Sequence, residues 1–217
     1  MGPDNRHADP RKQVVAAGYN RLAARYLEWA GAIVDDPRER MLGRFAELIP
    51  AGGRVLELGC GAGIPSTRQL AQRFEVLGVD ISPKQVELAR QNVPDAEFVE
   101  GDVSELSLQQ ESFHGVVALY AISHIPREQH ARLFNDVHGW LAAGGCFLAT
   151  LGATDAPDWT GDWQGTPMFF SSHDADTNRR LIREAGFHLL VDEVAVTYEP
   201  EGEVPFLWVL GQKANLA

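Results

Sequence analysis

Cysteine is scarce in this sequence: its 217 residues include only two, Cys60 and Cys146. Two thiols are too few for the disulfide framework of a small secreted protein or for a metal cluster built on cysteine. Both lie in segments whose apolar neighbours predict burial. We therefore interpret both as small buried side chains.

Long apolar runs are absent as well. No stretch approaches the roughly 20 apolar residues that a helix needs to cross a bilayer. The N-terminal residues MGPDNRHADPRK are polar and lack the apolar centre of a secretory signal peptide. These features predict a cytoplasmic protein that has no membrane partner.

Positive charge is in short supply, with 19 Lys and Arg against 30 Asp and Glu and a net charge of −11. Residues 1–50 hold 8 basic and 7 acidic side chains. Residues 51–217 hold the other 11 basic and 23 acidic side chains, which gives them a net charge of −12. An acidic body repels phosphate backbones, which argues against a nucleic-acid partner. It would not repel a cationic cofactor, and the charge also favours solubility.

The N-terminal part of the chain has the pattern of helices. Apolar residues recur at helical spacing over 12–29, and a second helix is predicted over 37–48. We expect residues 12–50 to form a helical lid and residues 1–11 to be disordered. The length and composition favour a single domain over 1–217.

Strands and helices alternate through the rest of the chain, which predicts a doubly wound α/β fold with a mostly parallel sheet. Strands are expected at 54–58, 75–80, 96–102, 113–121 and 145–152, with helices after Ile64 and at 83–93, 127–141 and 174–185. The chain ends in two more strands, 188–199 and 204–213, joined by a four-residue turn. Such a turn is too short for a parallel crossover, so the last of the seven strands must be antiparallel.

A glycine-rich loop follows the first strand, in the segment VLELGCGAGIPS. In an open α/β sheet, ligands bind at the carboxyl ends of the strands, and an acid at the end of the second strand, here Asp80, can accept both hydroxyls of a ribose. The dinucleotide fingerprint is G-x-G-x-x-G, but its sixth position is Ile64 here. Glu57 would also repel a pyrophosphate and attract a cationic amino-acid end. Both details disfavour a dinucleotide oxidoreductase.

The third strand ends in EGDVSEL, where an adenine ring would lie. Asp102 can accept a hydrogen bond from the exocyclic amine, and Val103 can offer its backbone N–H. Ile81 can pack on the other face of the ring.

The segments VLELGCGAG, VLGVDIS, FVEGDV, GVVALYAISHI and LAAGGCFLAT together resemble the motif series of the class I S-adenosylmethionine-dependent methyltransferases. The resemblance is strongest to the small-molecule branch that includes the ubiquinone/menaquinone-biosynthesis type, and it covers about residues 12–150. It implies a Rossmann-like methyltransferase fold that binds S-adenosyl-L-methionine and releases S-adenosyl-L-homocysteine.

The resemblance also implies roles for individual residues. The methionine part of the cofactor would be lined by Gly59, Cys60, Gly61 and the backbone of Leu119, with Glu57 helping to hold its amino group through the loop or water. Asp80 would bind the ribose, while Asp102 and Val103 would hold the adenine beside Ile81. Gln85 would reach the ribose or simply face solvent on its helix.

The helix containing YNRLAARY resembles the lid helix of the family. Tyr26 would then reach the cofactor carboxylate, and Tyr19 would face the substrate. The alternative is that both tyrosines are core packing of an amphipathic helix.

His124, just after the fourth strand, is the candidate catalytic residue. A histidine titrates near neutrality and can act as a general base for a protonated acceptor. Alternatively, it shapes the pocket without transferring a proton. Neither His124 nor the nearby His130 and His138 has metal-ligand spacing, so no metal is expected.

Residues 153–172 are expected to be a substrate-side insertion. Trp163, Met168 and Phe169, with Trp159 and Phe170, are too apolar for an ordinary surface loop and would form the roof of a substrate pocket. The alternative is a lid that packs on the body without touching substrate.

The sequence thus favours a methyltransferase that acts by in-line displacement on O, N or C of a small, aromatic metabolite. A cofactor-binding protein or non-methylating enzyme on the same fold is the main alternative, and a protein methyltransferase is less favoured. The sequence leaves open whether the protein is a monomer or a homodimer.

Overall fold

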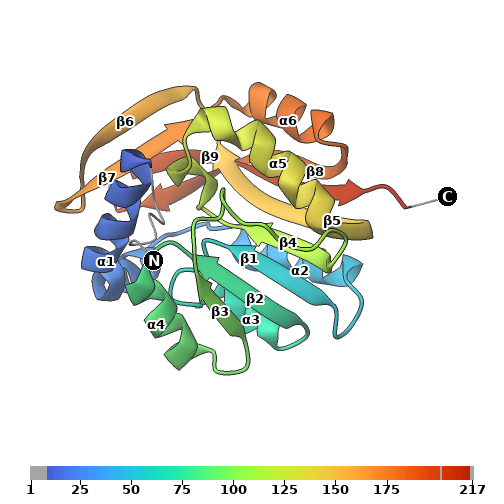
Figure 1. The fold of residues 1–217 in the computed structure, drawn as a ribbon. Coiled ribbons are helices and arrows are strands. Elements are labelled where there is room, and N and C mark those ends of the chain that lie inside the picture. Colours follow the sequence, from blue (N-terminus) through green and yellow to red (C-terminus); the bar gives the residue numbers. More distant parts are fainter. Residues whose placement is uncertain (1–8, 201, 216–217) are drawn as a thin grey trace, which may run out of the picture.

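The computed structural model describes residues 9–200 and 202–215, and its centre is a seven-stranded sheet (Figure 1). The strand order is β3-β2-β1-β4-β5-β9-β8, and only β9 runs antiparallel to its neighbours, β5 and β8. The strands are β1 (Arg54–Leu58), β2 (Glu75–Asp80), β3 (Glu97–Glu100), β4 (Phe113–Ala118), β5 (Leu141–Gly152), β8 (Phe187–Glu199) and β9 (Gly202–Lys213). The predicted sheet, including its reversed last strand, is confirmed.

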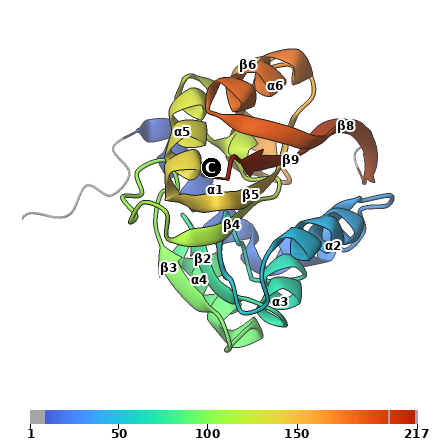
Figure 2. The ribbon, with the colours of Figure 1, turned by 90° about the vertical axis from the view of Figure 1, so that its right-hand side faces the viewer.

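Helices cover both faces of this sheet (Figure 2). On one face, α2 (Arg38–Leu48) and α3 (Ser66–Ala71) pack around Phe45 and Trp208. On the other, α5 (His130–Trp140) and α6 (Ala175–Glu184) pack around Phe134 and Phe147, whereas α4 (Pro83–Asn92) covers β2 and β3 on the same face as α3. Because both faces are covered, the central strands carry mainly apolar side chains, as parallel strands usually do.

The first helix, α1 (Pro10–Ala30), begins two residues before the predicted start. Asp9 caps it by accepting a hydrogen bond from the Arg11 backbone N–H at 2.9 Å, and Pro10 occupies the first position. Pro10 and Arg11 are therefore helical, which corrects the prediction of disorder through residue 11. Residues 1–8 lie outside the described part of the chain.

The predicted insertion forms a separate two-stranded hairpin of β6 (Ala156–Trp163) and β7 (Thr166–Ser172). Gln164 and Gly165 join the strands, both with positive φ (55° and 77°), as a two-residue hairpin turn requires. Met168 and Phe169 of β7 are buried against Val15 and Leu22 of α1. The hairpin and α1 therefore lie side by side over one end of the sheet (Figure 1).

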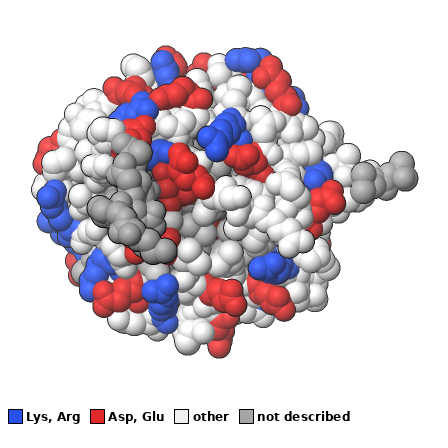
Figure 3. All heavy atoms as spheres, viewed as in Figure 1, with Lys and Arg blue, Asp and Glu red and all other residues white. Residues whose placement is uncertain are grey.

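Acidic and basic side chains are intermingled on the face shown in Figure 3. Over the described residues, this face therefore presents no contiguous basic surface of the kind that follows nucleic-acid phosphates. Within residues 9–200 and 202–215, every helix falls short of the length and apolarity needed to span a membrane.

Replacing Gly18 with valine is expected to lower the free energy of unfolding by about 1–3 kcal/mol, a typical cost of overpacking. A Cβ at Gly18 would lie 2.7 Å from Met168 Cε and 3.0 Å from the Pro167 carbonyl oxygen, so α1 would be pushed off the hairpin. Gly43→Ala on α2 is the control, because its Cβ meets no atom within 4 Å, and it should add about 0.5–1 kcal/mol. Urea unfolding measures the stability of both variants. A Gly18→Val variant with the same urea midpoint as the native protein would contradict the described packing.

Candidate functional site

The glycine loop after β1 lies at the carboxyl edge of the sheet, where ligands bind in this architecture. Gly59 has φ of +71°, and a side chain there would collide with Ala121. Gly61 has φ of +53°, and no atom lies within 4 Å of where its Cβ would be. The loop thus turns tightly and leaves backbone open to the space above it.

Asp80 ends β2 directly beside this loop. Its Oδ2 accepts a hydrogen bond from the Gly61 N–H at 2.9 Å, and its Oδ1 accepts one from the Ser82 N–H at 2.9 Å. Burial raises the pKa of Asp80 to about 6, although both hydrogen bonds favour the carboxylate. Each oxygen keeps a second lone pair, so the side chain can also accept hydrogen bonds from ligand hydroxyls.

A small cavity of about 80 Å³ lies above the loop and is called the inner cavity below. It is lined by all but two of the residues predicted to bind the cofactor: Tyr26, Gly59, Gly61, Asp80, Ile81, Gln85, Asp102, Val103 and Leu119. The fold therefore brings together residues that are far apart in the sequence, as the resemblance implied.

Glu57 and Cys60 are the two predicted residues whose side chains do not line this cavity. Glu57 points to the face covered by α3, because it shares a strand face with Val55, and it accepts a hydrogen bond from Thr67 Oγ1 at 2.5 Å. The Cys60 side chain packs against Val86 and other residues of α4, so only its backbone belongs to the loop.

The inner cavity has the polarity that a nucleoside-type ligand requires. Gln85 is 1% exposed, yet neither Nε2 nor Oε1 of its amide has a hydrogen-bond partner. Buried polar groups are normally paired, so this amide indicates a polar ligand group beside it. Gln85, Asp80 and the open Gly61 backbone therefore fit a hydroxyl-rich cofactor.

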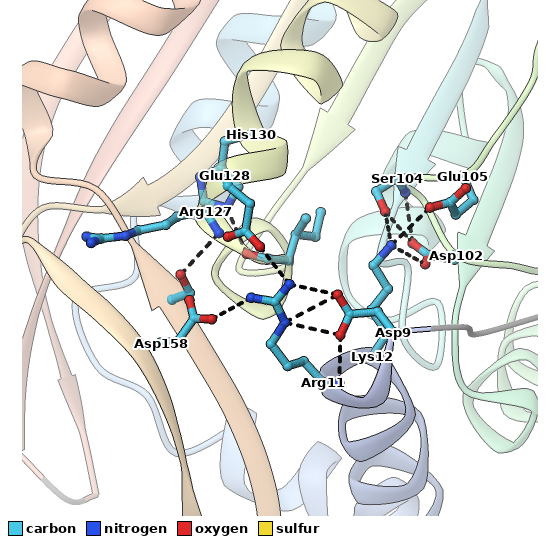
Figure 4. A network of polar contacts seen from close by, with 12 residues as sticks. Asp9, Arg11, Lys12, Asp102, Ser104, Glu105, Arg127, Glu128, His130 and Asp158 are labelled. Carbon is cyan, nitrogen blue, oxygen red and sulfur yellow. Dashed lines mark hydrogen bonds and ion pairs between the residues drawn. The ribbon is translucent and has the colours of Figure 1, made fainter.

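Lys12 is a residue of the inner cavity that sequence reasoning missed (Figure 4). Its Nζ lies 2.8 Å from Asp102 Oδ2 and donates to Ser104 Oγ at 2.7 Å, with Glu105 Oε1 at 3.3 Å. The Lys12 and Asp102 side chains are each only 5% exposed. The signal was present in the sequence, because Lys12 continues the helical spacing of Val15 and Tyr19 on the apolar face of α1.

A second cavity of about 310 Å³, called the outer cavity, adjoins the first. Seven of its twenty lining residues are Tyr, Trp or Phe, and they come from α1, the hairpin, β9 and the loop after β4: Tyr19, Tyr26, Trp29, Tyr120, Trp163, Phe170 and Phe206. Trp163 lines it as predicted. Met168 and Phe169 do not, because both side chains turn inward against α1 and are fully buried, and Phe170 faces the cavity instead.

Tyr19, Tyr26, Tyr120 and His124 line both cavities. His124 belongs to a short 3₁₀ turn, Ile122–His124, that follows β4. The strand ends at Ala118, three residues earlier than predicted, because Tyr120 adopts φ of +58° and breaks the extended chain. These four side chains therefore form the boundary through which a group would pass between the cavities.

Tyr19 and His124 form a hydrogen-bonded pair at this boundary. The His124 Nδ1 lies 2.9 Å from the Phe169 carbonyl oxygen, so Nδ1 carries the proton. The Nε2 then accepts a hydrogen bond from the Tyr19 hydroxyl at 2.7 Å. Burial lowers the pKa of His124 to about 4, so its ring is neutral at pH 7.

The other histidines near this segment serve the structure. His130 is 1% exposed, and its Nε2 pairs with the Ile125 carbonyl oxygen at 2.9 Å. No group of three or more His, Cys, Asp or Glu side chains among the described residues is arranged to hold a metal ion.

Comparison with known proteins gives a family for the central part of the chain. Residues 55–145 match a family described as a methyltransferase domain. The arsenite methyltransferase of Halobacterium salinarum is 35% identical over 156 residues, which are 66% of this chain and 39% of that protein. The chain spans about half the length of the curated relatives it matches.

Solved structures share the fold over nearly the whole chain. One is the 1,6-didemethyltoxoflavin-N1-methyltransferase of Burkholderia thailandensis, solved with 1,6-didemethyltoxoflavin and S-adenosylhomocysteine. Its TM-score is 0.70 at 18% sequence identity, and the match covers 94% of this chain and 88% of that one. Another is the [4+2]-cyclase SpnF, with a TM-score of 0.72 at 17% identity, covering 96% of this chain and 98% of that one. These likenesses concern the fold, which a methyltransferase and a cyclase share.

Glu57 is expected to make the stability of the protein depend on pH. Burial raises the pKa of Glu57 from its ordinary 4.5 to about 7, so the folded state binds this proton more tightly than the unfolded chain. The resulting stabilisation is full below about pH 4.5 and is lost as the pH rises through about 7, a change of roughly 3 kcal/mol.

Glu57→Gln should abolish this dependence and can still accept the Thr67 hydrogen bond. Its stability relative to the native protein should therefore increase by roughly 3 kcal/mol between pH 4.5 and 8. Urea unfolding across that range measures the difference, and Glu75→Gln, at an exposed position on β2, controls for charge removal. A constant difference between Glu57→Gln and native protein would contradict the raised pKa.

Proposed function

We propose that this chain, a member of the class I S-adenosylmethionine-dependent methyltransferases, transfers the methyl group of that cofactor to a small molecule held in the outer cavity. The observation that carries the proposal is the pair of adjoining cavities whose common boundary is Tyr19, Tyr26, Tyr120 and His124. One cavity has the polar side chains that suit a nucleoside, and the other has aromatic walls that suit an acceptor.

The residues of the inner cavity are assigned by their chemistry. Asp80 and Gln85 would bind the ribose hydroxyls, and Asp102 with the Val103 backbone would bind the adenine beside Ile81. The methionine chain would lie on the backbones of Gly59, Cys60, Gly61 and Leu119, with Tyr26 near its carboxylate. Glu57 would act from beneath the loop through the ionised fraction of its carboxyl group, which has a pKa of about 7 and favours the cationic end.

S-adenosylmethionine supplies a methyl group on a sulfonium, so the protein's task is to position the acceptor and exclude water. Positioning alone can contribute several kcal/mol to lowering the barrier. Tyr26 and Tyr19 offer aromatic surface beside the cationic centre, which favours the sulfonium by cation–π contact.

The proton of the acceptor would leave through Tyr19 to His124. The Tyr19 hydroxyl donates to His124 Nε2, so its oxygen has lone pairs left for an acceptor O–H or N–H. Methyl transfer would break the carbon–sulfur bond of the cofactor and release S-adenosylhomocysteine as the acceptor atom takes the methyl group. The acceptor proton would pass to Tyr19 and the Tyr19 proton to His124 Nε2, while the Nδ1–H of His124 would stay on the Phe169 carbonyl oxygen. His124 then acts as the base through Tyr19, although burial lowers its pKa to about 4 and makes it a weaker base than the near-neutral histidine that the sequence predicts.

A small aromatic acceptor is favoured by the size and walls of the outer cavity. Its volume, about 310 Å³, lies at the lower end of the usual range for ligand pockets. Trp163 packs on Tyr19 and Phe170 packs on His124, with ring centroids 6.3 and 4.6 Å apart, so these rings form a continuous aromatic wall. A non-methylating enzyme is the second candidate, because the cyclase SpnF has the same fold.

Calorimetric titration with S-adenosylhomocysteine tests the cofactor assignment, with NADH as the competing ligand. We expect S-adenosylhomocysteine to bind and NADH not to bind. Asp80→Asn should weaken the binding of S-adenosylhomocysteine by about 1.5–3 kcal/mol, the range for a hydrogen bond to a charged group. Asp95→Asn, at an exposed position in the turn before β3, is the matched control and should bind normally. Binding of NADH alone would overturn the assignment.

Tyr19→Phe and His124→Ala are each expected to lower kcat by roughly 10²–10⁴, the usual contribution of general base catalysis. The measurement needs an acceptor found by mass-spectrometric detection of methylated product in a panel of phenols, quinols and heteroaromatic amines. The loss should be largest for acceptors with the highest pKa. An unchanged kcat in His124→Ala would restrict that residue to shaping the pocket, and failure to detect methylation of any acceptor would favour the non-methylating alternative.

A further inference from the structure

Arg38 is the one cationic side chain among the described residues that line the outer cavity, if the neutral His124 is set aside. It extends from the start of α2 and does not line the inner cavity. It has no part in the proposed proton route. Its surroundings show that its guanidinium is held in place with donors to spare.

The guanidinium is fixed from two sides. Asp36 Oδ2 lies 3.1 Å from one terminal nitrogen of Arg38, and the guanidinium carbon lies 5.0 Å from the centre of the Tyr120 ring. Asp36 Oδ1 accepts hydrogen bonds from the Tyr120 hydroxyl at 2.7 Å and from the Arg38 backbone N–H at 2.9 Å. Asp36 therefore holds both the arginine and the tyrosine beneath it.

This arrangement leaves donors on Arg38 unused. Its Nε is buried and has no hydrogen-bond partner, although an unpaired buried donor costs about 1–3 kcal/mol. A guanidinium carries five N–H donors in a fixed fork that matches a carboxylate. Because Asp36 and Tyr120 already orient the group, its terminal N–H donors can meet a ligand oxygen in the outer cavity with little reorganisation.

We propose that Arg38 binds a carboxylate of the methyl acceptor, so that the acceptor is a flat aromatic acid. This inference rests on the proposed function and adds the class of substrate. The aromatic walls of the outer cavity take the ring, and Arg38 fixes the acidic end. Because Tyr120 lines both cavities and stacks on Arg38, the carboxylate also sets where the ring lies relative to Tyr19 and His124.

A carboxylate fits this site better than a phosphate does. Arg38 already shares its charge with Asp36, and Glu199 also lines the outer cavity. Residues 51–217 carry a net charge of −12. A singly charged planar carboxylate requires less positive charge than a dianionic phosphate, and one guanidinium that is already shared with Asp36 is the positive charge that this site offers.

The test compares aromatic acids with their uncharged primary amides in the presence of saturating S-adenosylhomocysteine. The probes are hydroxybenzoates, hydroxynaphthoates and indole carboxylates, each paired with its amide. Trp29 and Trp163 line the outer cavity, so quenching of tryptophan fluorescence reports binding there. We expect the native protein to bind at least one acid about tenfold or more tightly than its amide.

Arg38→Met should remove this preference for the acid and leave the affinity for S-adenosylhomocysteine within about twofold, which also shows that the variant is folded. Asp36→Asn/Arg38→Met is the second variant, because it removes both charges of the pair and leaves no unpaired carboxylate. Arg40→Met is the matched control: Arg40 is on the same helix, is 52% exposed and pairs with Glu193. It should keep the preference.

Three results would overturn the inference. In the first, native protein binds every acid and its amide equally. In the second, both Arg38 variants still prefer the acid over the amide. In the third, these variants lose S-adenosylhomocysteine binding but keep the preference for the acid. The last result would assign Arg38 to the methionine end of the cofactor. If native protein does not bind S-adenosylhomocysteine at all, the proposed function itself fails.

Discussion

The buried ion pair between Lys12 and Asp102 fixes the helix on which both cavities depend. It joins the first turn of α1 to the loop after β3, and breaking a pair so deeply buried typically costs about 3–5 kcal/mol. Arg11 adds contacts from the same turn to Glu128 and Asp158 (Figure 4), but these carboxylates are 56% and 41% exposed, and such pairs contribute about 0–1 kcal/mol. Lys12 therefore makes the strongest of the ion pairs of this turn, and it adds to the packing of Val15 and Leu22 on the hairpin. With α1 in place, Tyr19 and Tyr26 reach both cavities.

We propose that α1 acts as a lid, and the Lys12–Asp102 pair connects this lid to the site proposed for the cofactor. Asp102 is assigned to the adenine, yet one of its oxygens already lies beside Lys12 and the other accepts hydrogen bonds from Ser104. The adenine amine would share this carboxylate with Lys12 or displace it. Cofactor binding and the seating of α1 would thus be coupled, and α1 carries with it the aromatic wall of the acceptor site.

Much of the fold and of the inner cavity could be predicted because the signals are local. Strand β1, the glycine loop and Asp80 follow from apolar runs, turn residues and the rule that ligands meet the carboxyl ends of strands. The inward turn of Met168 and Phe169 could not be predicted, because it depends on the packing of the hairpin against α1. Arg38 was missed for a similar reason, since its orientation comes from Asp36 and from Tyr120, which is distant in the sequence.

Hydrogen–deuterium exchange of α1 tests most directly whether the Lys12–Asp102 pair holds the helix over both cavities. Lys12→Met should speed exchange throughout residues 10–30 while β1 and β4 keep their protection, because only the seating of the helix is lost. Arg11→Met, at the adjacent but more exposed position, should leave exchange close to that of the native protein. Equal exchange in Lys12→Met and native protein, or the same increase in both variants, would contradict the account.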